Sequence, residues 1–198
     1  MKKITSFFFF VLFIKLILIF LFPISADETY YWVWSKNIQL SYFDHPPMIS
    51  WLLAAFPFLD SFSGGFRIPI LIVGQLTFLI WILIAKERLS EKSLFIFMLL
   101  YTASPLLGIG SIISTPDIPL MLFWSLSIFL LLEYEKKPTT LNASLLGMAL
   151  GLGFCSKYHI VLFIPCLLVW IFLNYKNLSI KPIPILSAIL CGLVFSLS

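Results

Sequence analysis

The sequence predicts an all-α fold, a bundle of about seven membrane-spanning helices. Of the 198 residues, 61% are hydrophobic and only 11% are charged, and the mean hydropathy is +1.05. Soluble domains average about 45–50% apolar and about 25% charged residues, and a domain of this size cannot bury the excess from water. The net charge of +4 does not indicate nucleic-acid binding, because the basic residues cluster between apolar runs rather than along one solvated face.

A helix that crosses the bilayer needs about 20 mostly apolar residues, with a range of about 17–25. We expect the first span, at 4–22, to be a retained anchor, since it is long for a signal peptide and contains Lys15. Gly153 and Lys157 interrupt the stretch 141–173, which predicts a hairpin of two helices there. The seven predicted spans are 4–22, 66–85, 93–113, 118–132, 141–155, 159–173 and 182–198.

Basic residues set the expected orientation, because cytoplasmic loops carry an excess of lysine and arginine. With a cytoplasmic N-terminus and Lys15 inside the first span, nine of the 13 basic residues fall on the cytoplasmic side and three on the outer side. The outer side would also carry five acidic residues at or near membrane ends, where ionisable groups are costly and often functional. These are Asp27, Glu28, Asp44, Asp60 and Asp117.

The longest segment outside the spans, residues 23–65, predicts two amphipathic helices that lie in the membrane interface. Tyr30, Trp34 and Ile38 recur every fourth residue and give the first helix an aromatic face. Pro46 is suited to the first turn of the second helix. Because tryptophan and tyrosine are enriched at headgroup depth, we place both helices at the outer surface of the membrane.

The spacing of Asp27 and Glu28 leaves two interpretations open. As structural residues, Asp27 would be the N-cap of the first interfacial helix, and the helix dipole would favour both charges. As functional residues, a carboxylate at the membrane surface would be a general base or a metal ligand. Asp44 and His45 would stand at the N-terminus of the second helix, a position that attracts anions.

Five short motifs in a fixed order connect the chain to a known family. They are Asp27-Glu28 after the first span, Tyr42-Phe43-Asp44-His45-Pro46-Pro47, Arg67 opening the second span, Thr115-Pro116-Asp117-Ile118-Pro119 before the fourth and Ser156-Lys157-Tyr158 after the fifth. In order and in topological side, this set resembles the GT-C glycosyltransferases of family 39. The similarity is greatest to the bacterial branch related to the aminoarabinose lipid A transferase and to protein mannosyltransferases, and it covers residues 20 to about 175.

The resemblance implies a membrane glycosyltransferase that uses a polyprenyl-phosphate sugar donor at the outer, periplasmic face. The sugar would pass with inversion to an acceptor on a glycan, lipid A or a protein. Asp27 matches the acidic residue proposed in the family to activate the acceptor hydroxyl, and Glu28 would help to place it. The candidates for contacts to the donor phosphate are His45, Lys157 and Arg67, and the further site candidates are Asp44, Asp117 and Tyr158.

No group of residues in the sequence predicts a cofactor or a metal cluster, although the acidic residues alone could hold a divalent cation. Members of the family run to several hundred residues, so we expect 1–198 to be a single transmembrane domain, the amino-terminal part of a longer enzyme. A carboxyl-terminal half would then be a partner.

The alternatives to such an enzyme are an inactive or split fragment that acts only as a membrane subunit, and a transporter or flippase for a lipid-linked sugar. A transporter predicts ionisable residues at mid-bilayer and repeat symmetry, whereas only Lys15 lies deep in a span.

Overall fold

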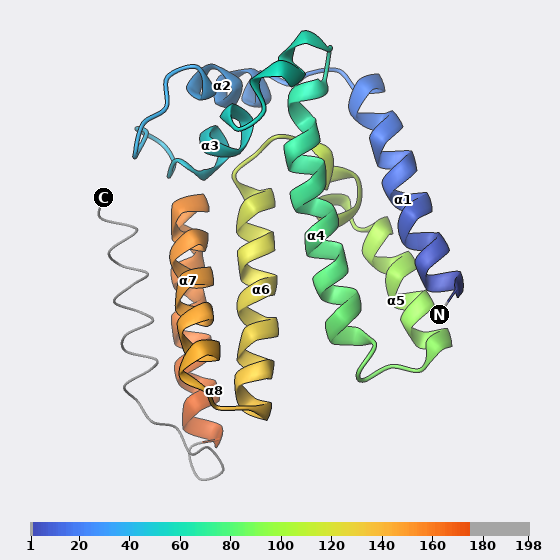
Figure 1. The fold of residues 1–198 in the computed structure, drawn as a ribbon, viewed down its shortest axis with the longest axis vertical. Helices are drawn as coiled ribbons and strands as arrows, with labels where there is room; N and C mark the ends of the chain where they lie inside the picture. The colour runs from blue at the N-terminus through green and yellow to red at the C-terminus, as the bar shows by residue number, and fades with distance from the viewer. Residues whose placement is uncertain (1, 175–198) are drawn as a thin grey trace. The chain divides into compact units, whose positions relative to one another are not determined.

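The structure is a computed structural model that describes residues 2–174 (Figure 1). Within that range every regular element is a helix and none is a strand, which confirms the predicted all-α class. The expected seventh span, 182–198, lies outside the described residues. Two compact units are present, unit 1 with residues 2–38 and 49–119 and unit 2 with residues 39–48 and 120–174.

Within residues 2–174, three helical segments are long and apolar enough to cross a bilayer. They are α1 (Lys2–Leu21), η2 with α4 (Gly65–Arg67 and Ile68–Ala85) and α6 (Asp117–Lys136). Their bounds agree with the predicted spans to within a few residues. On α1 the side chains of Phe9 and Phe10 are each 58% exposed. A helix with so much exposed apolar surface is typical of a protein surrounded by lipid.

The span predicted at 93–113 is not one straight helix. After α5 (Glu91–Ala103) the chain bends by 78° into η3 (Pro105–Ile109) and η4 (Gly110–Ile112). Proline disfavours the helical conformation in the residue that precedes it, and Ser104 is extended, with ψ at 132°. The bent pair is a fourth candidate crossing if both arms belong to one span.

The prediction of two helices within 141–173 is confirmed in unit 2. α7 (Thr140–Ser156) ends at Lys157, and η5 (Tyr158–Leu162) leads into α8 (Phe163–Asn174). Both α-helices are apolar but shorter than the three long segments. Residues of α6, η5 and α8 share one buried cluster, made of Leu120, Ile160, Phe163 and Leu167.

In unit 1, α1, α4 and α5 pack around a buried aromatic and aliphatic core. The ring of Phe78 on α4 lies between two others, stacked 5.8 Å from Phe8 and 4.6 Å from Tyr101. Val11 of α1 and Met98 of α5 belong to the same cluster. Close packing of this kind positions the carboxyl end of α1 and the amino end of α4, from which the candidate site is built.

Lys15 faces the interior of unit 1 rather than extending toward the membrane surface. Its side chain is 4% exposed, and its Nζ donates a hydrogen bond to Oγ of Ser111 in η4 at 2.7 Å. Ser111 also lies close to α4 at Gly74, where an added Cβ would be 2.8 Å from the Ser111 carbonyl oxygen. The lysine and the glycine therefore hold the bent segment against α1 and α4.

The first predicted interfacial helix is α2 (Ala26–Ser35). The rings of Tyr30 and Trp34 lie 4.7 Å apart on this helix, as the spacing of four predicts. Ile38, the third residue of the predicted aromatic face, lies beyond the end of α2. The helical face is therefore shorter than expected.

The second predicted helix is α3 (Met48–Ala54), which starts two residues later than predicted. Pro46 is followed by Pro47, and a residue before proline is restricted to extended backbone, so the helix begins only after both prolines. α3 is followed by η1 (Pro57–Ser61), and a glycine turn then leads to η2. Gly64 has φ at +79° in this turn, a conformation that favours glycine.

Candidate active site

The N-terminus of α2 is fixed by a capping box. Oγ of Ser25 accepts a hydrogen bond from the backbone N–H of Glu28 at 3.3 Å, and Oε2 of Glu28 accepts one from the backbone N–H of Ser25 at 3.1 Å. The interpretation of Asp27 as the N-cap is therefore wrong, because Ser25 takes that position and Asp27 lies inside the first turn. The reciprocal bonds satisfy two backbone donors that a helix end otherwise leaves unpaired.

Glu28 forms a bidentate ion pair with Arg67 at the start of α4. Nε of Arg67 donates to Oε1 and Nη2 donates to Oε2, both at 2.6 Å, and both side chains are 1% exposed. Arginine suits this arrangement because its planar fork matches the two oxygens of a carboxylate. The pair ties α2 to α4.

The other donors of Arg67 are also in use. Nη1 donates to the carbonyl oxygens of Ile19 and Phe22 at 3.0 and 2.9 Å, and Nη2 donates to that of Pro23 at 2.8 Å. Together with the two bonds to Glu28, these occupy the five N–H groups of a guanidinium. A donor phosphate could contact Arg67 only by replacing one of these bonds. The geometry therefore favours a positioning role for Arg67.

Glu28 also binds the segment that precedes α6. Its Oε1 accepts a hydrogen bond from the backbone N–H of Ser114 at 3.0 Å. Asp117 follows three residues later, so this hydrogen bond brings the acidic positions 27 and 117 into the same part of unit 1.

The charge state of Glu28 follows from these contacts. Burial alone raises the pKa of the carboxyl, but the hydrogen bonds from Arg67, Ser114 and Ser25 and the charge of Arg67 together hold its pKa below the ordinary value. Glu28 is thus an ionised, fully engaged carboxylate at neutral pH. It lacks the free, solvent-accessible oxygen that a general base needs.

Asp27, by contrast, is exposed. Its side chain makes no hydrogen bond or ion pair with the residues of unit 1 that the structure describes. It stands in the first turn of α2, where the helix dipole favours a negative charge. The capping box and the ion pair of Glu28 fix the backbone of this turn, and they leave the Asp27 carboxylate exposed.

The remaining candidate residues lie at helix ends and loops. Asp117 opens α6 and is half-buried. In unit 2, Asp44 and His45 lie in the bend before α3, where the His45 carbonyl oxygen accepts a bond from the backbone N–H of Tyr42 at 3.3 Å. Lys157 is half-buried in extended backbone between α7 and η5, and the exposed Tyr158 packs its ring 5.1 Å from that of Phe154.

Sequence reasoning missed two residues of the site. Ser25 could have been found, because serine followed three positions later by glutamate is the sequence pattern of a capping box. Ser114 contributes a backbone N–H, which any non-proline residue provides, so no sequence signal marks it. Across residues 2–174, no group of three or more histidine, cysteine, aspartate or glutamate side chains is arranged to hold a metal ion.

Comparison with known proteins now assigns the family. Residues 44–198 match the model of the dolichyl-phosphate-mannose-protein mannosyltransferase family, and the chain belongs to this family of GT-C membrane glycosyltransferases. The chain is also similar to the lipid A galacturonosyltransferase RgtD of Rhizobium johnstonii, with 25% identity over 142 residues. That match covers 71% of the chain and 30% of the relative, so the chain spans less than a third of the length of this relative. No solved structure matches the chain.

Proposed function

We propose that the protein is part of a membrane glycosyltransferase that transfers a sugar from a polyprenyl-phosphate donor to an acceptor hydroxyl at the outer face of a bacterial inner membrane. Three observations support the proposal: the family assignment, the similarity to a lipid A glycosyltransferase, and the exposed Asp27 beside a locked Glu28. The last of these carries the assignment of the base. With the N-terminus in the cytoplasm, α1 crosses the membrane and α2 lies at the outer face.

In the proposed reaction, the Asp27 carboxylate accepts the proton of the acceptor hydroxyl as the acceptor oxygen attacks the anomeric carbon. A new carbon–oxygen bond forms there, the bond to the phosphate oxygen breaks, and the electron pair leaves with the polyprenyl phosphate. Displacement in one step inverts the anomeric centre, as in inverting hydrolases that use separate acid and base. His45 and Lys157 are proposed contacts to the phosphate, whose growing charge a cation stabilises.

Glu28 and Arg67 act in this proposal as positioning residues. Their pairing anchors the first turn of α2 to α1, to α4 and to the segment before α6. Proton transfer requires the base to lie within hydrogen-bond reach of the proton, and a rigid helix terminus supports that accuracy. The acceptor, whether a glycan, lipid A or a protein, would meet Asp27 from the exposed side of α2.

The test is a transfer assay on membranes that contain the expressed full chain, with radiolabelled polyprenyl-phosphate sugars and a lipid A acceptor. Asp27→Asn keeps the size of the side chain and removes the base, so we expect the transfer rate to fall by about 10²–10⁴-fold. The control is Glu133→Gln, near the far end of α6, where the carboxylate is paired with Lys136. A rate in Asp27→Asn equal to that of the control would remove Asp27 as the base.

A further inference from the structure

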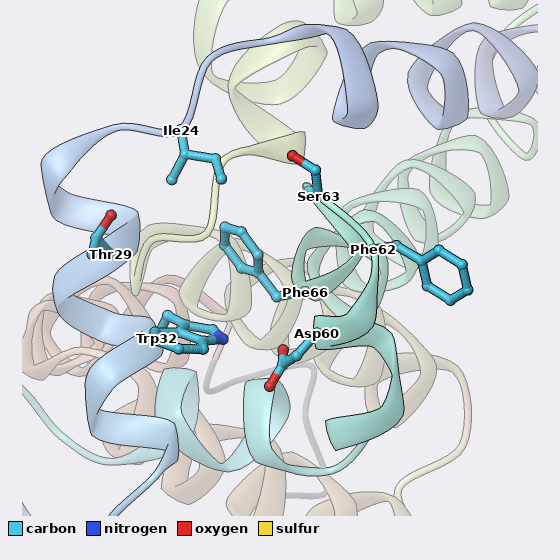
Figure 2. A pocket seen from close by; sticks show the side chains of 8 residues that line it. Ile24, Thr29, Trp32, Asp60, Phe62, Ser63 and Phe66 are labelled. Carbon is cyan, nitrogen blue, oxygen red and sulfur yellow. The ribbon is translucent and has the colours of Figure 1, made fainter.

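A second feature of unit 1 is a cavity of about 260 Å³ beside α2 (Figure 2). In Figure 2 the side chains of Trp32, Asp60 and Phe66 point toward one another, while Phe62 points away from them. Trp32 follows Asp27 by five residues, and at about 100° per residue the two side chains leave α2 about 140° apart. The cavity is therefore separate from the carboxylate that we propose as the base.

Lys36 contacts two of the residues that line the cavity, Asp60 and Trp32. Its Nζ forms an ion pair with Oδ2 of Asp60 and lies 4.4 Å from the centroid of the Trp32 ring. The side chain of Asp60 is 17% exposed. Because the lysine neutralises the charge of Asp60 and lies over one face of the indole, the carboxylate and the ring stay side by side.

Several polar groups at the cavity remain available to a ligand. In the described part of unit 1, the indole N–H of Trp32, Oδ1 of Asp60 and the hydroxyl of Ser63 have no hydrogen-bond partner. The Thr29 hydroxyl donates to the carbonyl oxygen of Ser25 at 3.1 Å and can still accept a bond. The cavity thus offers a donor, a carboxylate acceptor and two hydroxyls within aromatic walls.

The chemistry of these walls selects among ligands. A pyranose has a C–H face that packs on aromatic rings and hydroxyls at its rim that both donate and accept hydrogen bonds. A phosphate would meet the carboxylate of Asp60, and an alkyl chain would leave the carboxylate and the indole N–H without partners. Small-molecule pockets measure about 300–1,000 Å³, so a cavity of about 260 Å³ suits one ring rather than an oligosaccharide.

We propose that this cavity binds one neutral sugar residue of a glycan, at a site distinct from that of glycosyl transfer. Trp32 and Phe66 supply the stacking surface, and Oδ1 of Asp60 accepts hydrogen bonds from the sugar hydroxyls. The ion pair with Lys36 makes the site selective for an uncharged sugar. Binding here requires neither the polyprenyl-phosphate donor nor the base, so it can fail or succeed independently of the proposed reaction.

The test is saturation-transfer difference NMR on the full chain in lipid nanodiscs, with methyl glucoside, galactoside and mannoside as probes and no donor present. We expect a saturable signal on the ring C–H protons of at least one probe. Trp32→Ala should weaken binding by at least about 10-fold because it removes the ring and the N–H. Trp32→Phe keeps a ring and should weaken binding by about 2–10-fold, the effect of one hydrogen bond. Phe62→Ala is the matched control at the same cavity and should bind as the unchanged protein does.

Three results would overturn the proposal. One is the absence of a saturable signal from all three probes with the unchanged protein. Another is equal binding by Trp32→Ala and Phe62→Ala, with the helical content of both verified by circular dichroism. The third is displacement of the probe by inorganic phosphate. If Trp32→Ala does not fold, Trp32→Phe and Asp60→Asn decide, because unchanged binding in both excludes the indole N–H and the carboxylate as contacts.

Discussion

Replacement of Arg67 by lysine tests whether the buried ion pair anchors the candidate site. The guanidinium serves five acceptors, namely two oxygens of Glu28 and the carbonyl oxygens of Ile19, Phe22 and Pro23. Lysine keeps the charge but has three N–H groups, so at least two acceptors lose their donor. At about 1–3 kcal/mol for each buried polar group left unsatisfied, Arg67→Lys should lower the free energy of unfolding by about 2–6 kcal/mol.

The measurement is unfolding of the protein in mixed detergent micelles, followed by far-ultraviolet circular dichroism as the fraction of denaturing detergent rises. Arg88→Lys is the matched control, because within the described residues the exposed Arg88 side chain makes one hydrogen bond, of 3.3 Å to the Ile84 carbonyl oxygen. We expect that substitution to change the free energy of unfolding by less than about 0.5 kcal/mol.

A double-mutant cycle separates the pair from the rest of the network. Glu28→Gln and Arg67→Met each leave one buried charge without its partner, a loss that costs about 3–5 kcal/mol. The double variant removes both charges, so its loss should be smaller than the sum by about 0.5–3 kcal/mol. The reasoning is refuted if Arg67→Lys is no less stable than Arg88→Lys, or if the two single losses simply add.

Two further predictions concern stability. Folding lowers the pKa of Glu28, so the stabilisation by this carboxylate is present above its unfolded pKa of about 4.3 and is lost as the pH falls through the lower, folded value. Unfolding of the unchanged protein, measured from pH 7 to pH 3, should show this loss of stability. The variant Glu28→Gln should lack this part of the pH dependence. Gly74→Ala places a Cβ 2.8 Å from the Ser111 carbonyl oxygen and should lower the free energy of unfolding by about 1–3 kcal/mol in the same detergent titration. The control is Leu79→Ala on the partly exposed face of α4, which introduces no such clash. Equal stability of the two variants would contradict the close approach of Gly74 and Ser111.

The helices were predictable because hydropathy is a property of neighbouring residues. The apolar runs at 4–22 and 66–85 give α1 and α4 almost to the residue, and the break at 157 gives the end of α7. Hydropathy did not reveal the 78° bend after α5, since both arms are apolar, although Pro105 carried the local signal. The start of α3 was misplaced because only one of two adjacent prolines was weighed.

The candidate site was predictable only in part. The acidic pair at 27 and 28 stands out in the sequence, but nothing local distinguishes the two carboxylates. Tertiary structure separates them by bringing Arg67 from 39 residues away and the Ser114 N–H from 86 residues away onto Glu28. The same folding turns Lys15 inward to Ser111, across 96 residues of sequence.

The sequence by itself determined that this chain is a helical membrane protein, and it marked the acidic pair at 27 and 28 at the start of a helix. Those features depend on contacts within a helical turn or on transfer of a short segment into lipid. Only the tertiary structure decided that Glu28 is a buried anchor, that Asp27 is left exposed and that a polar cavity forms beside Trp32. Those outcomes depend on the close packing of segments distant in the sequence, which determines which polar groups are buried and which partners they find.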